Sequence, residues 1–337
     1  MVPALAVAGA LRAEGAEVAF IGGARAEAEL VPGAGFELRQ IAVEGMSRTN
    51  PLRAVLALLG AARAYTRALS LLKELKPDAV MGGGGYVAGP VGLAAVTLRI
   101  PLVLTEADSH LGLTNRVLAR AARRVCLAFP LAGREGMRYR VTGRPGPPAR
   151  EDREGVRERF GLAAGRDCVF VFGGSLGARS INLAAVEAFA YAEFDVLHVA
   201  GRRDYPELAA RALPAGYDLR EYLDLDEFAD ALAAADLVVA RAGGSVFEIA
   251  ASGTPAILVP YPHASADHQT ENARWMADAG AAVVIDDGEL DGRRLANEVT
   301  ALLADRERLG EMARAAKGLA RPDAAKEIAH ELLEAAA

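Results

Sequence analysis

The sequence predicts an α/β protein built from two Rossmann-like domains. Along all 337 residues, short apolar runs rich in β-branched residues alternate with helical patterns, which is typical of a parallel sheet covered by helices. A stretch rich in proline and charge, Gly143–Gly155, interrupts this alternation once. Glycine-rich loops follow strand-like runs on both sides of it. We therefore expect domains at residues 1–143 and 166–337, joined by a linker at residues 144–165.

The composition excludes several classes of protein. Hydrophobic residues make up 52% and charged residues 24% of the chain, which is typical of a globular protein and argues against a long disordered tail. A net charge of −6 argues against general nucleic-acid binding. Cys126 and Cys168 each lie in an apolar run, so we expect them in the core and not in a disulfide or zinc site. A signal peptide would have Lys or Arg before its apolar segment, and the apolar start of this chain has neither. No apolar run has the length of a membrane span.

The first half begins with a predicted helix. Apolar residues recur at helical spacing from Ala4 to Leu11, and Gly15 is placed to end the helix. EVAFIG then has the pattern of a strand. The later elements expected in this half are strands in DAVMGG, PLVLTEA and RVCLAF and helices at Pro51–Lys76, near Val91 and at Leu113–Arg123. A parallel α/β sheet normally begins with a strand, and no strand precedes the first helix here.

The second half repeats the alternation. Its expected strands lie in CVFVFG, DVLHVAG, DLREYL, DLVVA, PAILVP and AAVVID, and helical segments continue from Leu290 to the end. Each half thus predicts a doubly wound sheet. In such sheets ligands bind beyond the carboxyl ends of the strands.

The loop in FVFGGSLGARSIN (residues 170–182) is suited to hold a diphosphate. A buried strand runs into Gly173, Gly174, Ser175 and Gly177, and a helix starts near Ala178. Backbone N–H groups of such a loop, those of Gly174 and Gly177 among them, and the positive end of the helix meet at one place. A tight strand-to-helix turn without a ligand is the alternative reading of the same pattern.

A second loop of this kind occurs in ARAGGSVFEIAASG (residues 240–253). Gly243 and Gly244 follow the strand, and Ser245 and Glu248 have the spacing of a capping box. The Glu248 carboxylate is also suited to accept two hydrogen bonds from a vicinal diol, such as that of a ribose. Both interpretations are open from the sequence.

Two further polar segments lie in the second half. In PHASADHQTENA, the residues His263, Asp267, His268, Gln269 and Asn272 favour a polar loop over a sugar phosphate, and a metal site is the alternative. Asp224 and Asp226 form a DxD pattern that a helix N-cap explains more simply than a metal site.

In the first half, MGGGGYVAGP and TEADSHLGLTN each follow a predicted strand. Glu106, Asp108 and His110 form an ionisable cluster at the expected ligand-binding end of the sheet. Solvated loop residues are an equal alternative, because charged residues are common in surface loops.

In this order and spacing, the segments PALAVAGAL, GGGGYVAGP, GLTNR, GGSLGA, ADLVVARAG with Glu248, and DHQTENA resemble the MurG family of peptidoglycan N-acetylglucosaminyltransferases. The resemblance covers nearly the whole chain. It implies two Rossmann-like domains in the GT-B arrangement, with the sugar nucleotide held mainly by the C-terminal domain and the lipid acceptor by the N-terminal one.

The resemblance also implies roles for particular residues. On the donor side it places Ser175 at the diphosphate, Gly244 and Ser245 in the donor loop, Glu248 at the ribose, Leu223 beside uracil and Gln269 at the N-acetylglucosamine hydroxyls. Asp108 matches the asparagine that ends the family's His-Glu-Gln-Asn motif, which here is TEAD. The family's Gly-Asn-Pro-Val-Arg here is GRPGPPAR, so its arginine corresponds to Arg144 or Arg150, and we favour Arg144.

The start of the chain departs from the family. In the family, a strand and a glycine-rich loop ending in Gly-Gly-His precede a segment like VPALAVAG, and that histidine is a candidate general base. We therefore expect the natural reading frame to extend upstream of Met1, and we expect this 337-residue chain to be poorly soluble and impaired. Within the chain, Asp108 is the candidate base.

The function implied by the resemblance is inverting transfer of N-acetylglucosamine from UDP-GlcNAc to the 4-hydroxyl of a lipid-linked N-acetylmuramoyl-peptide, without a cofactor or a metal. The enzyme is expected at the cytoplasmic face of the cell membrane as a peripheral protein. A UDP-GlcNAc 2-epimerase and a non-catalytic sugar-nucleotide-binding protein are the alternatives.

The helix expected at Pro51–Lys76 is a candidate for contact with an anionic membrane surface. It combines apolar and basic residues: Leu52, Val55, Leu56, Leu59, Leu69, Leu71 and Leu72 with Arg53, Arg63, Arg67, Lys73 and Lys76. An ordinary helix that packs its apolar side on the sheet is the alternative.

Overall fold

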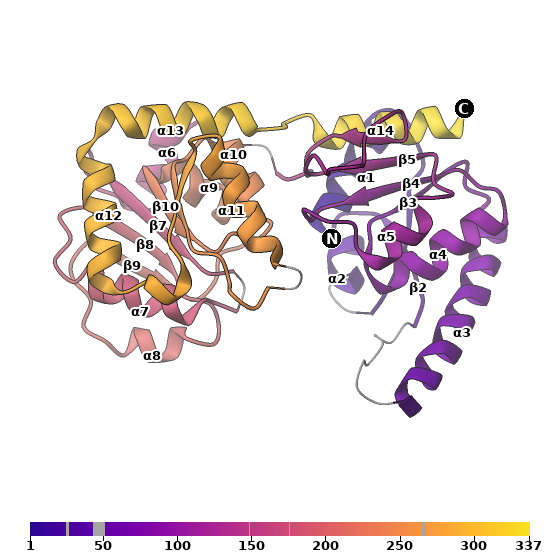
Figure 1. The fold of residues 1–337 in the computed structure, drawn as a ribbon, viewed down its shortest axis with the longest axis horizontal. Helices are drawn as coiled ribbons and strands as arrows, with labels where there is room; N and C mark the ends of the chain where they lie inside the picture. Colours follow the sequence, from indigo (N-terminus) through magenta and orange to yellow (C-terminus); the bar gives the residue numbers. More distant parts are fainter. Residues whose placement is uncertain (25–26, 43–50, 148, 175, 265–266) are drawn as a thin grey trace. The chain divides into compact units, whose positions relative to one another are not determined.

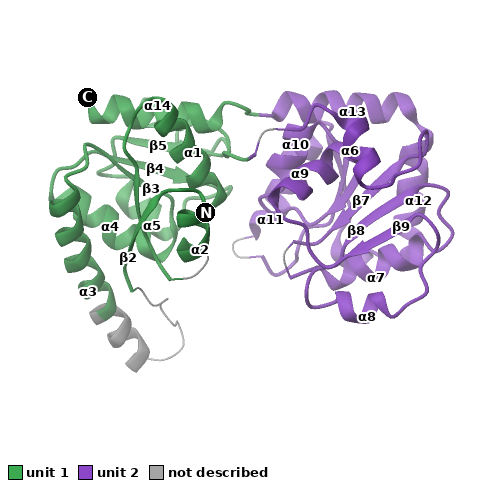
Figure 2. Cartoon of the chain, turned by 180° about the vertical axis from the view of Figure 1, so that it is seen from behind, with its two compact units in different colours: residues 1–146, 321–337 green, residues 147–320 purple. Residues whose placement is uncertain are grey.

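A computed structural model describes residues 1–24, 27–42, 51–147, 149–174, 176–264 and 267–337, and for residues 51–59 it describes the backbone alone. The chain forms two compact units: unit 1 is residues 1–146 and 321–337, and unit 2 is residues 147–320 (Figure 2). Each unit contains its own parallel sheets.

Unit 1 holds the first half of the chain and its last helix (Figure 1). Its elements are α1 (Val2–Ala13), β1 (Ala19–Gly22), α2 (Glu27–Gly33), β2 (Glu37–Gln40), α3 (Pro51–Leu75), β3 (Val80–Gly82), α4 (Gly85–Thr97), β4 (Leu102–Glu106), α5 (Leu113–Leu118), β5 (Arg124–Leu127), β6 (Tyr139–Val141) and α14 (Ala324–Ala336).

The strands of unit 1 form two sheets. β1 pairs with β2, and β3, β4, β5 and β6 pair in that order, all in parallel. Ile21 of β1 packs on the same apolar cluster as Val80 of β3 and Leu104 of β4. Among the described strands, β1 and β3 therefore each have one unpaired edge. The expected strand upstream of Met1 stays a prediction.

The predicted domain boundaries need two corrections. The last helix, α14, belongs to unit 1 because Ile328 and Leu332 are buried against Val7 of α1 and Val103 of β4. The buried Glu331 carboxylate of α14 accepts a hydrogen bond from Arg124 of β5 and forms an ion pair with Arg140 of β6.

The predicted linker is the second correction. Residues 147–165 belong to unit 2 and contain a helix, α6 (Arg153–Arg159). The Asp152 side chain caps this helix by accepting from the backbone N–H of Gly155, and the helix packs on α9 (Leu225–Ala234). Two of the charged residues that suggested a linker, Arg150 and Arg153, form ion pairs within unit 2.

Unit 2 continues the alternation of strands and helices (Figure 1). After α6, its elements are β7 (Cys168–Phe172), α7 (Arg179–Ala188), β8 (Asp195–Val199), α8 (Tyr205–Ala209), β9 (Tyr217–Arg220), α9, β10 (Leu237–Ala240), α10 (Val246–Ser252), β11 (Ala256–Leu258), α11 (His268–Asp278), β12 (Ala282–Val284), the 3₁₀ helix η2 (Asp287–Glu289), α12 (Gly292–Ala304) and α13 (Arg306–Leu319).

The unit 2 sheet has the order β12-β11-β10-β7-β8-β9, and every pair is parallel. All residues of β7, β8 and β10 are buried, because helices cover both faces of these central strands. The chain leaves β7 toward β8 and β9 and returns on the other side as β10. The switch in direction therefore lies between β7 and β10.

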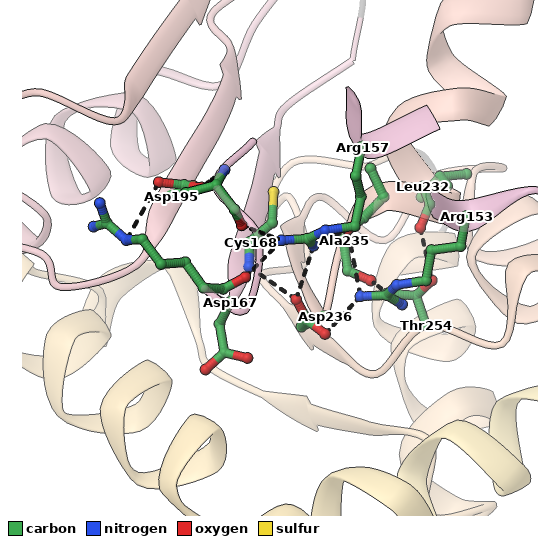
Figure 3. A network of polar contacts seen from close by, with 12 residues as sticks. Arg153, Arg157, Asp167, Cys168, Asp195, Leu232, Ala235, Asp236 and Thr254 are labelled. Carbon is green, nitrogen blue, oxygen red and sulfur yellow. Dashed lines mark hydrogen bonds and ion pairs between the residues drawn. The ribbon is translucent and has the colours of Figure 1, made fainter. Parts of the chain in front are cut away.

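A carboxylate stands at the start of each of three neighbouring strands, β10, β7 and β8 (Figure 3). Asp236 binds Arg153 and Arg157 of α6 and accepts from the backbone N–H of Cys168 at 2.9 Å. Asp167 pairs with Arg306 through both guanidinium nitrogens, at 2.7 and 2.6 Å. Asp195 accepts from the N–H of Ala163 at 2.8 Å. These contacts tie α6 and α13 to the amino ends of the strands.

The described part of α3 corrects the predicted membrane-contact helix. Leu71 and Leu72 are buried in the unit 1 core and Leu69 is half-buried against it, so their apolar side faces the sheet. Arg63 and Arg67 are exposed, and so are Lys73 and Lys76. The side chains of Leu52, Arg53, Val55, Leu56 and Leu59 lie outside the described part of the helix.

Both cysteines lie in the core, as predicted. Cys126 on β5 is 1% exposed and Cys168 on β7 is fully buried, and burial raises the pKa of each thiol to about 12. Neither side chain forms a disulfide. Within the described ranges, no helix is long and apolar enough to cross a membrane.

Candidate active site

The carboxyl ends of β7 and β10 bring together the two glycine-rich loops of unit 2. β7 and β10 are direct neighbours, with Phe172 opposite Ala240 at their last paired residues. The loop after β7 leads into α7, and the loop after β10 leads into α10. Because the chain changes direction between these strands, this is the position where doubly wound sheets bind their ligands.

The loop after β7 is compact and depends on glycine. Gly174 and Gly177 have φ values of +91° and +81°, a region that other residues rarely adopt. A Cβ atom on Gly173 would lie 2.3 Å from the Ala178 nitrogen, and one on Gly177 would lie 2.0 Å from the Ala200 oxygen. Ser175 lies outside the described residues.

One predicted role in this loop is wrong. The N–H group of Gly177 donates to the carbonyl of Gly174 at 2.9 Å, so it closes the loop and does not point to a ligand. Gly177 instead permits the close approach of Ala200 and Gly201. The N–H groups left for an anion are those of the first turn of α7, whose N-cap residue, Ala178, makes no side-chain cap.

The starts of the unit 2 helices differ in how they are capped. Aspartate side chains cap α6, α9, α12 and α13. The N-cap residues of α7, α8, α10 and α11 make no side-chain cap, and of these four helices α7 and α10 directly follow the neighbouring strands β7 and β10. First-turn N–H groups without a cap are suited to bind an anion, which favours a phosphate site at the switch point.

The loop after β10, which we call the donor loop, does not have the capping box that was one interpretation of its sequence. Ser245 is the N-cap residue of α10, yet its hydroxyl makes no capping hydrogen bond, so the predicted Ser245–Glu248 capping box is not formed. Gly244, Ser245 and Glu248 are each half-buried. The capping box at Asp224 is formed instead: Asp224 accepts from the N–H of Glu227 at 2.8 Å, and the Glu227 side chain accepts from the N–H of Asp224 at 3.0 Å.

Arg241, which sequence reasoning did not single out, organises the same edge. Its guanidinium donates to the carbonyls of Val259 and Pro260 and to the Ser180 hydroxyl, and it pairs with Asp287 at 2.6 Å. It thus joins the loop after β10 to β11, α7 and η2. The available signal was an arginine directly after a buried strand and before Gly243, where a charge needs a partner.

The predicted polar residues are divided between the loop before α11 and α11 itself, which contains His268, Gln269 and Asn272. Gln269 accepts from the backbone N–H of Tyr261 at 3.0 Å through its side-chain oxygen, which leaves its amide nitrogen to donate elsewhere. Asn272 donates to the carbonyl of Ala242 at 2.9 Å and so holds the donor loop against α11. Leu223, expected beside uracil, is 5% exposed next to Asp224. Among the residues that the structure describes, no three His, Cys, Asp or Glu side chains are grouped as metal ligands would be.

In unit 1, the predicted ionisable cluster divides into two kinds of residue. Glu106 ends β4 and accepts from the N–H of Gly112 at 2.9 Å and from the Asn115 amide at 3.0 Å, so it holds the loop together. Asp108 is exposed, and only its backbone N–H reaches Glu106. The His110 Nδ1 and Asn115 Oδ1 atoms are buried without a hydrogen-bond partner in the described part of the chain.

The two arginines matched to the family arginine lie in different settings. Arg150 binds Asp226 and Asp230 of α9, the latter at 2.8 Å. Arg144 belongs to unit 1, and its Nε atom is buried without a hydrogen-bond partner among the described residues. Burial and, second, the Arg144 charge lower the pKa of the Met1 amino group, so Arg144 lies near the start of α1.

The structure therefore gathers the predicted residues into two groups. Gly244 and Ser245 in the loop after β10, Glu248 in the first turn of α10 and Gln269 in the first turn of α11 lie at the carboxyl edge of the unit 2 sheet. Asp108 follows β4 at the corresponding edge of the unit 1 sheet, and Arg144 follows β6.

Comparisons with known proteins agree with this arrangement. Residues 1–127 match the N-terminal domain of glycosyltransferase family 28, and residues 168–328 match its C-terminal domain. The chain is 42% identical to the UDP-N-acetylglucosamine–N-acetylmuramyl-(pentapeptide) pyrophosphoryl-undecaprenol N-acetylglucosamine transferase of Moorella thermoacetica, over 98% of this chain and 95% of the relative. The enzyme of the same name from Halorhodospira halophila is also 42% identical, over 97% and 92%.

The chain belongs to the MurG family of family 28 glycosyltransferases.

Solved structures support the same assignment. The crystal structure of Acinetobacter baumannii MurG matches with a TM-score of 0.78 and 32% identity, over 98% of this chain and 95% of that one. The calicheamicin glycosyltransferase CalG4, with 18% identity and a TM-score of 0.69, shares the fold alone. The predicted α/β class and the family resemblance are thus confirmed.

Proposed function

We propose that the protein transfers N-acetylglucosamine from UDP-GlcNAc to the 4-hydroxyl of a lipid-linked N-acetylmuramoyl-peptide, with inversion at the anomeric carbon. The observation that carries the proposal is the uncapped start of α7, directly after the glycine-rich loop at the switch point of unit 2, in a chain of the MurG family. The names of the relatives give both substrates, and the first turn of α7 is suited to hold the diphosphate of the donor.

On the donor side, the half-buried Glu248 carboxylate accepts the two hydroxyls of the ribose. Gly244 lets the ligand approach the loop closely, Ser245 donates its uncommitted hydroxyl, and Leu223 lies beside the uracil. Gln269 donates its amide N–H to the sugar hydroxyls, because its oxygen is occupied by Tyr261. We keep Ser175 at the diphosphate, as the family resemblance implies.

The reaction moves negative charge onto the leaving group. As the bond between the anomeric carbon and the phosphate oxygen breaks, charge grows on the UDP diphosphate, and the first-turn N–H groups and the dipole of α7 stabilise it. The acceptor oxygen forms the new bond on the opposite face of the sugar and loses its proton to a base.

On the acceptor side, we propose Asp108 as the base of this chain. Glu106 is committed to holding Gly112 and Asn115, while the Asp108 side chain is exposed at the end of β4. Arg144, which follows β6 in the same unit, contributes a positive charge to acceptor binding. Replacing Asp108 with asparagine should lower kcat by about 10² or more with a smaller effect on KM, as expected for loss of general-base catalysis.

The decisive test for the donor site is UDP binding to Glu248→Ala. Losing two hydrogen bonds to a charged group, each worth about 1.5 kcal/mol, should weaken UDP binding about a hundredfold. Isothermal titration calorimetry on the folded variant measures this. An unchanged affinity would assign Glu248 a structural role only.

Product analysis separates the proposed reaction from the alternatives. Incubation with labelled UDP-GlcNAc and lipid acceptor should yield UDP and a lipid-linked disaccharide. Appearance of UDP-ManNAc without acceptor would indicate a 2-epimerase, and UDP binding without any product would indicate a non-catalytic binding protein. The epimerase structure from Listeria monocytogenes is 16% identical with a TM-score of 0.71, so it shares the fold alone.

We propose that unit 1 also contacts the cytoplasmic face of an anionic membrane. Four apolar side chains of α4 and α5 are between 50% and 65% exposed: Tyr86, Leu93, Leu113 and Val117. α5 and α3 both pack on α4, and α3 carries the exposed Arg63 and Arg67. Apolar side chains beside basic ones are suited to the interface of an anionic bilayer.

Replacing both Arg63 and Arg67 with glutamate should lower sedimentation with anionic vesicles at low salt. Equal sedimentation of variant and parent would exclude these arginines from membrane contact.

A further inference from the structure

A chain of buried polar side chains runs behind the phosphate-binding loop of unit 2. The Tyr217 hydroxyl lies 2.7 Å from Nδ1 of His198, and Nε2 of His198 lies 3.0 Å from Oδ1 of Asn182. The Asn182 Nδ2 group donates to the Ala200 carbonyl and to Asp204, both at 2.9 Å. His198, Asn182 and Asp204 are at most 2% exposed.

The partners fix the direction of every hydrogen bond. Asn182 faces a carbonyl and a carboxylate with one end of its amide, so that end must be the NH₂ group and Oδ1 must face His198. His198 therefore carries its proton on Nε2, and Nδ1 accepts from Tyr217. Burial lowers the pKa of His198 to about 3, so the imidazole stays neutral at ordinary pH. The chain of bonds has one proton arrangement.

This chain of bonds ends at the backbone that supports the loop. Ala200 and Gly201 follow β8, and they lie directly against Leu176 and Gly177: a Cβ atom on Gly201 would be 2.2 Å from the Gly177 nitrogen. Asn182 stands in the first turn of α7, directly after the loop. The Asn182 amide thus joins the start of α7 to the carbonyl that packs on Gly177.

We propose that His198 and Asn182 are positioning residues that hold the described part of this loop, Gly173, Gly174 and Leu176–Ala178, and the start of α7 in the geometry that a diphosphate requires. The proposal rests on the donor site proposed above. Uridine makes its contacts through other loops, so the pair should affect the diphosphate and leave the nucleoside unaffected. A preorganised loop binds an anion more tightly because it loses less entropy on binding.

The test compares uridine with UDP by calorimetry. The quantity measured is the ratio of the uridine Kd to the UDP Kd, which isolates the contribution of the diphosphate. In His198→Phe and Asn182→Leu, which keep most of the side-chain volume, we expect this ratio to fall at least tenfold while the uridine Kd stays within twofold. His198→Gln, which can again donate to Asn182, should recover most of the ratio.

The matched control is Thr254→Val in the same unit. Thr254 is 4% exposed and donates to the Leu232 carbonyl at 3.0 Å, on the side of the sheet drawn in Figure 3. The variant loses this bond and the one with the Ser252 hydroxyl at 2.7 Å, both near the amino end of β11, so it should lose stability and keep the ratio. Tyr217→Phe removes a single hydroxyl and provides a milder variant, with an expected fall of about threefold.

The outcomes separate the inference from the proposed function. A parent protein that binds UDP no more tightly than uridine would overturn both the donor site and this inference. If the parent has a large ratio and the folded variants His198→Phe and Asn182→Leu keep that ratio, the inference alone is overturned. Equal weakening of uridine and UDP would also overturn it, because that result indicates general destabilisation.

Discussion

The two ends of the three central strands of unit 2, β10, β7 and β8, carry different kinds of residues. At their amino ends, Asp236, Asp167 and Asp195 are joined to arginines and backbone N–H groups (Figure 3). At their carboxyl ends the chain has glycines: Gly173 after β7 and Gly201 after β8, with Arg241 and Gly243 after β10. Each of these strands thus starts at a carboxylate, whereas closely packed glycines stand beside the ion pair of Arg241 with Asp287 at the carboxyl ends.

The difference indicates that the two ends serve different purposes. Arginine and carboxylate pairs fix helices α6 and α13 against the sheet, and they use up the donors and acceptors that take part in them. At the carboxyl ends, the uncapped start of α7 keeps N–H groups for an anion. The loops there are supported by the neutral pair His198 and Asn182 and by charged contacts of Asp204 and Arg241. The amino edge therefore serves stability, whereas the carboxyl edge combines support with the capacity to bind.

The largest effect is expected at the carboxyl edge, from Gly177→Ala. A Cβ atom there would lie 2.0 Å from the Ala200 carbonyl oxygen, at a φ of +81°, so the loop must move. We expect UDP affinity to fall about a hundredfold, equivalent to about 3 kcal/mol. Gly174→Ala is the matched control, since it has a similar φ of +91° and no atom within 4 Å of its Cβ. It should cost about 1 kcal/mol of stability. Equal loss of UDP affinity in both variants would contradict the role of close packing.

The opposite result is expected at the amino edge. Asp236→Ala leaves the guanidinium groups of Arg153 and Arg157 and the N–H of Cys168 without their carboxylate. The free energy of unfolding should fall by about 3 kcal/mol, as when one partner of a largely buried pair is removed. UDP affinity of the folded variant should be unchanged. Urea unfolding followed by circular dichroism gives the first quantity and calorimetry the second, and a weaker UDP complex would show that the two edges are coupled.

The sequence predicted the carboxyl edge better than the amino edge. Glycines before a helix have a local signature, so the loops after β7 and β10 could be recognised from adjacent residues. The amino-edge contacts join residues far apart in the chain, such as Arg153 with Asp236 and Arg306 with Asp167. Such pairs depend on strand order, which local patterns do not determine. The prolines and charges of Gly143–Gly155 consequently suggested a linker, although the chain begins α6 at Arg153.

Within the site, the limits have the same origin. The Gly177 N–H donates to the Gly174 carbonyl, and Ser245 forms no cap. Both features depend on backbone geometry, which the residue types alone do not determine. The support from His198 and Arg241 comes from side chains on buried strands or directly after them, which sequence patterns assign to the core. The last helix, α14, was placed in the wrong domain because its apolar face does not specify which sheet it covers.

The pH dependence of stability tests whether His198 supports the loop as a neutral side chain. The folded-state pKa of His198 is about 3, below the value of about 6.5 expected in the unfolded chain, so the unfolded chain binds the proton first. This contribution to stability is fully present above pH 6.5 and is lost as the pH falls toward 3, by about 1.4 kcal/mol per pH unit. Urea unfolding at several pH values should show that His198→Gln reduces this slope. An unchanged slope would mean that His198 is already protonated in the folded protein or does not titrate in the unfolded one.

The smallest effect is expected from Arg150→Ala. Arg150 pairs with Asp226, whose side chain is 85% exposed, and with Asp230 of the same helix. Pairs open to solvent contribute little, so the free energy of unfolding should fall by about 1 kcal/mol or less. Because Arg150 is held by α9, UDP affinity should not change. Arg144→Ala is the informative comparison, because Arg144 belongs to unit 1 and its guanidinium has a buried nitrogen without a described partner. We expect the KM for the lipid acceptor to rise about tenfold, as for loss of one charged hydrogen bond. A higher acceptor KM in the Arg150 variant and not in the Arg144 variant would reverse the assignment.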